Sequence, residues 1–205
     1  MPSIYDIKPR FQALLRPCVR ALARAEVTAN QVTVAALVVS CVVGAVVAWQ
    51  RDSKLVLLLL PVWLFLRMAL NAIDGMLARE HGQASKLGAV LNEMGDVIAD
   101  AGLYLPLALR SEFVPIPLVI VVLLGVMIEM GGVVGVQIGA SRRYDGPLGK
   151  SDRAFCFGAL GLAFALIPAS DTLLKIGTVV LWLMVAGGAY TLINRARGAL
   201  QEIAK

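Results

Sequence analysis

Charged residues are scarce in this sequence, and this scarcity excludes an ordinary soluble domain. Only 16% of the 205 residues are Asp, Glu, Lys or Arg, whereas 59% are hydrophobic. Soluble domains contain about 25% charged and about 45–50% apolar residues. The composition and length therefore predict an integral membrane protein with a single domain. The net charge of +5 predicts basic loops that face anionic lipid, and we expect no nucleic-acid partner.

Histidine and cysteine are also rare, which argues against two common kinds of metal site. The one histidine, His81, cannot build a histidine site alone, and Cys18, Cys41 and Cys156 have no metal-binding spacing. Their odd number implies no disulfide framework, so we interpret the cysteines as small buried apolar residues. The first 27 residues contain no short apolar run ending in A-x-A, and we expect no cleavable signal peptide there.

The first 27 residues are instead rich in Lys and Arg and predict an amphipathic helix. Apolar residues recur there at helical spacing, namely Ile7, Phe11, Leu14, Leu15, Cys18, Val19 and Leu22. Such a helix lies in the headgroup plane of a membrane, and a solvated basic tail is the alternative. We therefore divide the chain into a juxtamembrane helix over residues 1–27 and a transmembrane domain over residues 28–205.

Long apolar runs predict six membrane-spanning helices, because a span needs about 20 mostly apolar residues. The runs cover residues 30–50, 55–78, 86–109, 114–139, 153–169 and 172–194. The predicted fold is an all-α integral membrane protein with six transmembrane helices and an interfacial N-terminal helix. Most Lys and Arg outside the spans fall on one side, so the positive-inside rule predicts that both termini are cytoplasmic. The loops on the other side carry only Arg51, Lys54, Arg110 and Lys175.

Polar side chains interrupt the second and third predicted spans, near the short loop that joins them. Asn71 and Asp74 share one helical face, and Asn92 and Asp96 share another. The two helices are antiparallel, so we expect these four oxygen-bearing side chains to meet in one pocket near the cytoplasmic side. Hard divalent cations bind such oxygen ligands, and Arg79 at the water boundary is suited to attract phosphate. The alternative is a buried polar network that only ties the two helices together.

Three further charges lie inside predicted spans, where ionisable groups are costly. Arg67 and Asp100 fall at similar depth on matching faces, and we predict that they form an ion pair beneath the pocket. Arg67 pointing toward the asparagines is the alternative. Glu129 is expected to form a hydrogen bond to a neighbouring helix, or else to reach the pocket. Gly131, Gly135 and Gly139 form a small-residue series that predicts close helix packing, within the bundle or across a dimer.

The pattern D-G-x-x-A-R-(x8)-G-x-x-x-[D/N]-x-x-x-D resembles the signature of the CDP-alcohol phosphotransferases. "TANQVT" (residues 28–33) resembles the T-P-N-x-x-T segment that opens the first span in that family. The resemblance covers most of the chain, including the six spans and the N-terminal helix. The pattern is made up here of Asp74, Gly75, Ala78, Arg79, Gly88, Asn92 and Asp96.

The resemblance implies displacement of CMP from a CDP-linked donor by an alcohol, with Mg²⁺ or Mn²⁺ as cofactor. It implies that Asp96 is the general base that deprotonates the acceptor hydroxyl. The implied metal ligands are Asn71, Asp74, Asn92 and Asp96, and the implied CDP site is formed by Gly75, Ala78, Arg79 and Gly88.

Two departures from the family pattern concern the metal. Asn71 and Asn92 stand where the family has aspartates, and an amide oxygen can ligate a hard cation but contributes no negative charge. Three outcomes remain open: one ion instead of two, compensation by Glu93 or Asp100, or loss of catalysis.

A basic cluster precedes the fifth predicted span, in "SRRYDGPLGKSDR". The cluster either orients the chain and attracts lipid headgroups or binds the phosphate of an acceptor alcohol. A tight turn through Gly146, Pro147 and Gly149 favours the second interpretation. The cluster is formed by Arg142, Arg143, Lys150 and Arg153.

The predicted function is transfer of a phosphatidyl group from CDP-diacylglycerol to an alcohol. The acceptor is expected to be phosphorylated, such as glycerol 3-phosphate, which would make the chain similar to a phosphatidylglycerophosphate synthase. The resemblance implies a homodimer in a bacterial inner membrane. The alternative function is a catalytically silent member that binds CDP-lipid or a phospholipid headgroup as a regulator. A transporter fits less well, because the polar residues stop about halfway across the membrane.

Overall fold

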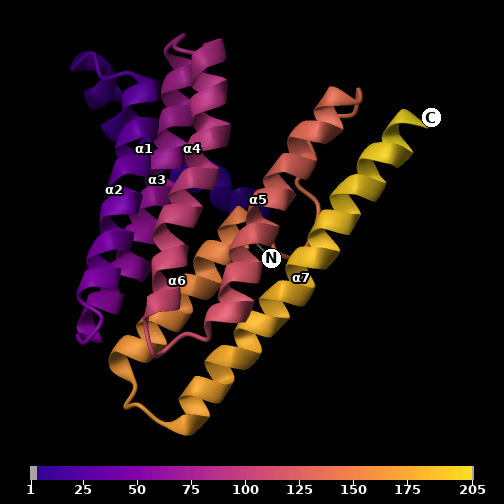
Figure 1. Cartoon of the computed structure of the whole chain (residues 1–205). Coiled ribbons are helices and arrows are strands. Elements are labelled where there is room, and N and C mark those ends of the chain that lie inside the picture. The colour runs from indigo at the N-terminus through magenta and orange to yellow at the C-terminus, as the bar shows by residue number, and fades with distance from the viewer. Residues whose placement is uncertain (1–3, 205) are drawn as a thin grey trace.

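The computed structural model describes residues 4–204, with side chains from residue 10 onward, and this part of the chain is all helical, as predicted. Seven α-helices are joined by short loops and two 3₁₀ segments (Figure 1). They are α1 (Ile4–Arg24), α2 (Ala29–Trp49), η1 (Leu55–Leu58), α3 (Leu59–Glu80), α4 (Lys86–Tyr104), η2 (Leu105–Leu109), α5 (Pro115–Gln137), α6 (Lys150–Leu166) and α7 (Asp171–Ile203). Figure 1 shows α5 and α7 diverging from α2, α3 and α4 toward the upper end of the bundle.

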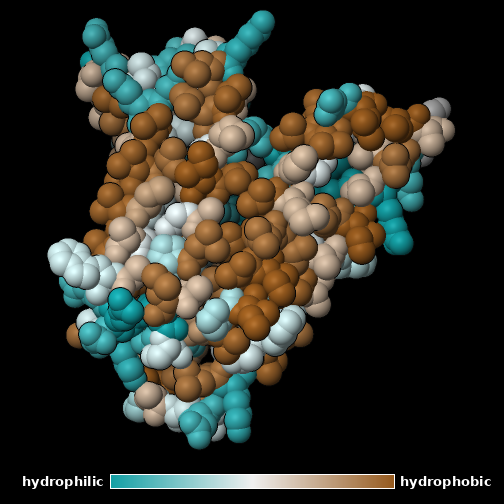
Figure 2. Space-filling model, in the orientation of Figure 1, coloured by the Kyte–Doolittle hydropathy of each residue, from teal (hydrophilic) through white to brown (hydrophobic). Residues whose placement is uncertain are grey.

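Four helical segments of the described chain are long and apolar enough to cross a bilayer: α2, η1 with α3, α5 and α7. Exposed apolar side chains cover much of these helices, and Figure 2 shows them over the middle of the visible face, with polar residues toward the ends. The other two predicted spans correspond to α4, which carries Glu93, Asp96 and Asp100, and to α6, which has 17 residues. These two helices hold much of the polar network described below.

Several helix ends differ from the predicted spans, and three of them affect the description of the site and the core. The α4 helix ends at Tyr104 and tightens into η2, because Pro106 has no N–H to donate to the Gly102 carbonyl. The α6 helix begins at Lys150 rather than at residue 153, and α7 continues to Ile203 rather than ending at residue 194. Apolar run length measures only the lipid-facing part of a helix, whereas Arg, Ala, Leu, Gln and Glu sustain helix beyond the apolar run.

The N-terminal helix α1 packs against α3. Val19 is buried there in a cluster with apolar residues of α2 and α3, such as Ile73 and Met76. Arg16 forms an ion pair of 3.3 Å with Glu80 at the end of α3. Ile7, the first residue of the predicted apolar stripe, lies outside the described side chains.

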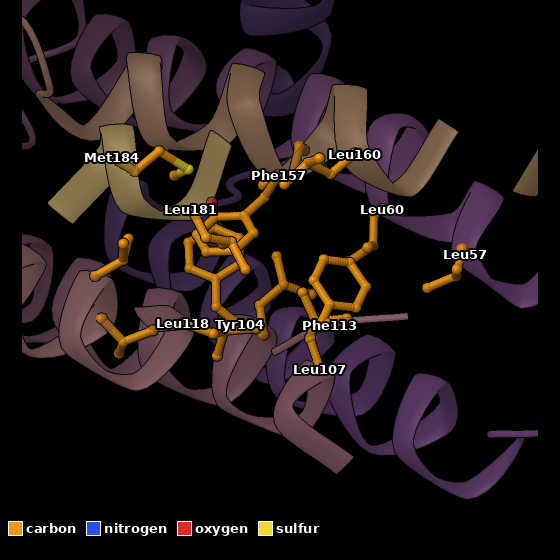
Figure 3. Close-up of a cluster of buried hydrophobic side chains, with 14 of the residues drawn as sticks. Leu57, Leu60, Tyr104, Leu107, Phe113, Leu118, Phe157, Leu160, Leu181 and Met184 are labelled. Atoms are coloured by element: carbon orange, nitrogen blue, oxygen red, sulfur yellow. The ribbon is translucent and has the colours of Figure 1, made fainter. Parts of the chain in front are cut away.

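The largest apolar core lies at the end of the bundle where α4 finishes. Tyr104 and Phe157 stack there with ring centroids 4.2 Å apart, and leucines of α3, α5 and α7 surround them (Figure 3). Along α3 and α4 the charged side chains and the asparagines lie between this core and the α3–α4 loop. The fold therefore separates a closed apolar half from a polar half.

Two of the α5 glycines serve contacts within the chain. A Cβ added to Gly131 would lie 3.3 Å from Leu192, and one added to Gly135 would lie 3.4 Å from Ala199. Both partners belong to α7, so the small-residue series lets α5 and α7 approach closely, which is one of its two predicted uses. Gly139 ends α5 with a φ of +98°, a value that favours glycine.

Candidate functional site

The first pocket opens between the start of α2, the end of α3 and the start of α4. It has a volume of about 350 Å³. The Thr28 hydroxyl accepts from the Gln31 N–H, and the Gln31 side chain accepts from the Thr28 N–H, which fixes the start of α2 beside it. The predicted residues brought together here are Asn71, Asp74, Gly75, Ala78, Arg79, Gly88 and Asn92. Sequence reasoning gave no site role to the other lining residues, which are Ala29, Asn30, Thr33, Gln83, Ala84, Ser85 and Ala89.

Asp74 is the buried carboxylate of the first pocket. Its side chain is 6% exposed and accepts a hydrogen bond of 2.8 Å from the Thr33 hydroxyl. Within residues 10–204 no Lys or Arg forms an ion pair with Asp74. A buried carboxylate without a cationic partner is costly, and Asn71 and Asn92 bring amide groups to the same pocket. This donor set suits a hard divalent cation.

Two glycines keep the first pocket open. A Cβ added to Gly75 would lie 3.2 Å from Nη1 of Arg79, so the guanidinium lies directly over this glycine. A Cβ added to Gly88 would lie only 2.8 Å from Oδ1 of Asn30. Real Cβ atoms essentially never show so short a contact. Among the described side chains Arg79 has no carboxylate partner, and its charge is available for an anion such as phosphate.

The second pocket lies beside the first, between α4, α5, the loop before α6, and α7. Its volume is about 340 Å³. Asn92 lines both pockets, and the second also receives Asp96, Arg142 and Lys150 from the predicted set. The remaining lining residues are Glu93, Glu129, Tyr144, Gly149, Ser151, Asp152 and Arg195. Of these, Glu93 and Glu129 were expected as alternative members of the predicted pocket.

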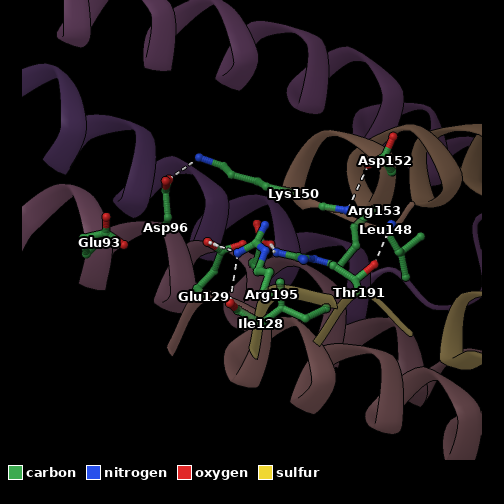
Figure 4. A network of polar contacts seen from close by, with 12 residues as sticks. Glu93, Asp96, Ile128, Glu129, Leu148, Lys150, Asp152, Arg153, Thr191 and Arg195 are labelled. Atoms are coloured by element: carbon green, nitrogen blue, oxygen red, sulfur yellow. Dashed lines mark hydrogen bonds and ion pairs between the residues drawn. The ribbon is translucent and has the colours of Figure 1, made fainter. Parts of the chain in front are cut away.

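Asp96 contacts two cationic side chains of the chain itself. The Lys150 ammonium, at the first residue of α6, forms an ion pair with Oδ1 of Asp96 (Figure 4). Nη2 of Arg67 lies 3.5 Å from the same oxygen and donates a 3.2 Å hydrogen bond to the Asp96 backbone carbonyl. The predicted general base is therefore held between α3 and α6.

The predicted Arg67–Asp100 ion pair is confirmed. Nη1 of Arg67 lies 2.5 Å from Oδ1 of Asp100, and both residues are buried. A second arginine, Arg153, completes the arrangement, because its Nη2 donates to Oδ2 of Asp100 at 2.9 Å. Asp100 thus compensates two buried arginines and lies away from both pockets.

Glu129 forms ion pairs with three arginines from different parts of the chain. Its carboxylate lies 3.3 Å from Arg142, 3.4 Å from Arg195 and 3.6 Å from Arg153. Glu93 also binds Arg142, at 2.7 Å. The sequence signal for Glu129 was a lone charge within an apolar run, whereas Arg195 was counted only among the basic residues after the last predicted span. Their partners come from loops and helices that are distant in sequence.

The predicted basic cluster is divided by the fold. Arg142 and Lys150 line the second pocket, whereas Arg153 is buried against Asp100, and Arg143 binds Asp145 at 2.6 Å and Glu202 at 3.1 Å. The hydrogen bond from Arg143 to Asp145 raises the pKa of Arg143. Only half of the predicted cluster therefore lines the second pocket.

No three Asp, Glu, His or Cys side chains of the described residues converge as a metal-binding group. A site built on three or more such side chains is therefore not found in the part of the chain that the structure describes. The asparagine substitutions explain this result, because they leave Asp74 as the acidic side chain of the first pocket. The residues fit a cation held by one carboxylate and neutral oxygen ligands.

The comparisons with known proteins agree with the motif. A family model described as CDP-alcohol phosphatidyltransferase matches residues 26–193. The inner membrane protein YnbA of Escherichia coli (strain K12) is 43% identical over 202 residues, which cover 97% of this chain and 96% of that protein.

Solved structures of similar fold include phosphatidylinositol phosphate synthase (PgsA1) of Mycobacterium tuberculosis. The structure with CDP-DAG bound has a TM-score of 0.75 at 21% identity and covers 89% of this chain and 92% of that chain. The complex of the same protein with manganese and citrate has a TM-score of 0.73 at 20% identity and covers 90% of this chain and 88% of that chain. At these identities the similarity shows a common fold.

Proposed function

The chain belongs to the CDP-alcohol phosphatidyltransferase family, and on that premise we propose that it is a membrane phosphotransferase. It would move the phosphatidyl group of CDP-diacylglycerol to an alcohol and release CMP. One observation carries this proposal: the motif residues from Asn71 to Asn92 line one pocket, and Asp96 lines a second pocket that shares Asn92 with it. Donor and acceptor would thus meet beside α4, at Asn92, which lines both pockets.

The first pocket is the proposed donor site. Arg79, which has no carboxylate partner among the described residues, would bind the diphosphate, and Gly75, Ala78 and Gly88 would line the CDP moiety. The proposed ligand positions for Mg²⁺ or Mn²⁺ are Asn71, Asp74, Asn92 and Asp96. When bound, the cation would supply positive charge to the phosphoryl oxygens. The manganese complex of PgsA1 supports this choice of cation.

The chemistry proposed for Asp96 is proton removal. Its carboxylate would accept the proton of the acceptor hydroxyl while the hydroxyl oxygen forms a bond to the phosphatidyl phosphorus. The bond from this phosphorus to the bridging oxygen breaks, and CMP leaves with the bonding electron pair. Arg79 would stabilise the charge that develops on the departing phosphate.

The second pocket is the proposed acceptor site, and a phosphorylated acceptor such as glycerol 3-phosphate is the proposed class. Arg142, Lys150 and Arg195 all line this pocket. Nε of Arg142 and Nε of Arg195 are buried without a hydrogen-bond acceptor among the described residues. An acceptor with anionic oxygens would supply such partners.

The proposed setting is a bacterial inner membrane with cytoplasmic N- and C-termini. The four apolar helices and the similarity to an inner membrane protein support membrane integration. We propose that α4 and α6 complete six spans, that α1 lies in the membrane interface, and that the chain forms a homodimer. A span for α4 is favoured because its Asp100 is compensated by two arginines.

A second candidate function is a catalytically silent member that binds CDP-lipid or a phospholipid headgroup. The observation that favours it is the engagement of Asp96 by Lys150, together with asparagines at positions 71 and 92. Purified protein with CDP-diacylglycerol, Mn²⁺ or Mg²⁺ and a panel of alcohols separates the two functions. The enzyme should release CMP with at least one acceptor, and Asp96→Asn should abolish this release. Equal CMP release by both proteins, or none by either, would refute the catalytic proposal.

A further inference from the structure

We infer that the chain binds a single divalent cation, at Asp74, because Lys150 already supplies the positive charge beside Asp96. The inference rests on the proposed cation site and removes Asp96 from its four proposed ligand positions. It concerns two acidic side chains that face different pockets and have different partners.

The Asp96 carboxylate already has cationic partners. Oδ1 of Asp96 contacts the Lys150 ammonium (Figure 4). The same oxygen also lies 3.5 Å from Nη2 of Arg67. A divalent ion at this oxygen would have to displace the ammonium and would also be repelled by the guanidinium. The guanidinium of Arg67 cannot move away cheaply, because Arg67 is 4% exposed and is fixed by its 2.5 Å contact with Asp100.

The surroundings of Asp74 differ, because the charges of Lys150 and Asp96 act on it only at longer range. It accepts a hydrogen bond from Thr33 and has no cationic partner among the described side chains. It lines the first pocket, whereas Asp96 lines the second, and Asn92 is the one proposed ligand that lines both. A second ion between the carboxylates would therefore depend on the neutral amide of Asn92, which does not offset the repulsion from Lys150.

Because Lys150 supplies a positive charge beside Asp96, the chain would need only one divalent ion from solution. One divalent ion at Asp74 would act on the donor side, and Lys150 would bring permanent positive charge to the acceptor side. The lysine is held for this position by the fold, because it begins α6 and follows the turn that ends at Gly149. Lys150 is thus assigned as a charge-supplying residue that acts on Asp96.

Counting bound Mn²⁺ tests the inference without any turnover. Purified protein in detergent micelles would be titrated with Mn²⁺, and electron paramagnetic resonance would measure the free ion. We expect one bound Mn²⁺ per chain for the unaltered protein and one for Asn92→Asp, because the added carboxylate leaves Lys150 in place. The double variant Asn92→Asp with Lys150→Gln should bind two. Replacing the glutamine by arginine at position 150 should return the number to one.

The matched control is Asn92→Asp with Lys175→Gln, since Lys175 is an exposed residue near the start of α7, away from both pockets. This control should bind one ion. Two ions or none on the unaltered protein, or one ion on the Asn92→Asp, Lys150→Gln variant, would overturn the inference. If that variant does not fold, Lys150→Gln alone decides: it should tighten Mn²⁺ binding by roughly fivefold, as expected when one unit charge is removed near a divalent ion. Unchanged affinity would also overturn the inference.

These results are independent of the proposed function. One bound Mn²⁺ without CMP release would refute the phosphotransferase activity and leave the cation assignment intact. CMP release by a protein that binds two Mn²⁺ would refute the assignment and leave the activity intact.

Discussion

Asp100 is the shared counter-charge of two buried arginines, and its loss should destabilise the bundle. It is 8% exposed and receives Arg67 at 2.5 Å and Arg153 at 2.9 Å. Replacing Asp100 by Asn leaves two buried guanidiniums without their main counter-charge. Removal of one partner from a buried pair costs about 3–5 kcal/mol, and we expect the free energy of unfolding of Asp100→Asn to fall by that amount.

The same geometry predicts a smaller cost for Arg67→Met. Asp100 keeps Arg153 in that variant, so no buried charge is left unpaired. The main loss is the one hydrogen bond from Arg67 to the Asp100 carboxylate, which is worth about 1.5–3 kcal/mol. The double variant should cost less than the sum of the single variants, with a coupling of about 0.5–3 kcal/mol. Asp52→Asn, in an exposed loop, is the control and should change stability by less than about 0.5 kcal/mol.

Sodium dodecyl sulfate titration in mixed micelles, followed by circular dichroism, would measure these free energies. A cost below about 1 kcal/mol for Asp100→Asn, or a larger cost for Arg67→Met than for Asp100→Asn, would refute this account of the ion pairs. A charge exchange of Arg67→Asp with Asp100→Arg should not restore stability, because the new arginine would lie beside Arg153.

Three further predictions concern the first pocket. Arg79→Gln should lower kcat/KM for CDP-diacylglycerol by about 10- to 150-fold, the equivalent of one lost hydrogen bond to a charged group, and unchanged kcat/KM would exclude Arg79 from the donor site. Gly88→Ala should raise KM for CDP-diacylglycerol, because the added methyl group displaces the terminal amide of Asn30. The free energy of unfolding should change by less than about 1 kcal/mol. A large loss of stability would show that Gly88 serves packing instead. Asn71→Asp and Asn92→Asp should each lower the Kd for Mn²⁺ measured by isothermal titration calorimetry, and unchanged affinity in both would remove these positions from the cation site.

The helices and the first pocket could be predicted from the sequence, because they depend on local patterns. Apolar runs fix where a helix can lie in lipid, and the short α3–α4 loop makes the helices antiparallel neighbours. The spacing of Asn71, Asp74 and Asn92 then brings all three to one pocket. Arg67 and Asp100 could be paired by the same reasoning, because both lie on these two helices.

The second pocket could not be predicted in full, because its contacts join distant parts of the chain. The position of Arg142 opposite Glu93 depends on the path of the loop after α5, and no periodicity encodes that path. An error of three residues at the start of α6 also had a large effect. It placed Arg153 at the entrance of the predicted span, whereas Arg153 lies one turn inside α6 and is directed at the buried Asp100.

The most direct test of the proposed function is whether CMP release is coupled to a new phospholipid. Purified protein would be given CDP-diacylglycerol, Mn²⁺ and glycerol 3-phosphate or other alcohols, with CMP measured by chromatography and lipid products by mass spectrometry. We predict one phosphatidyl product per CMP for at least one acceptor, and neither product with Asp96→Asn. Binding of CDP-diacylglycerol with neither CMP nor a new lipid, for every acceptor tested, would contradict catalysis and support the silent, lipid-binding alternative.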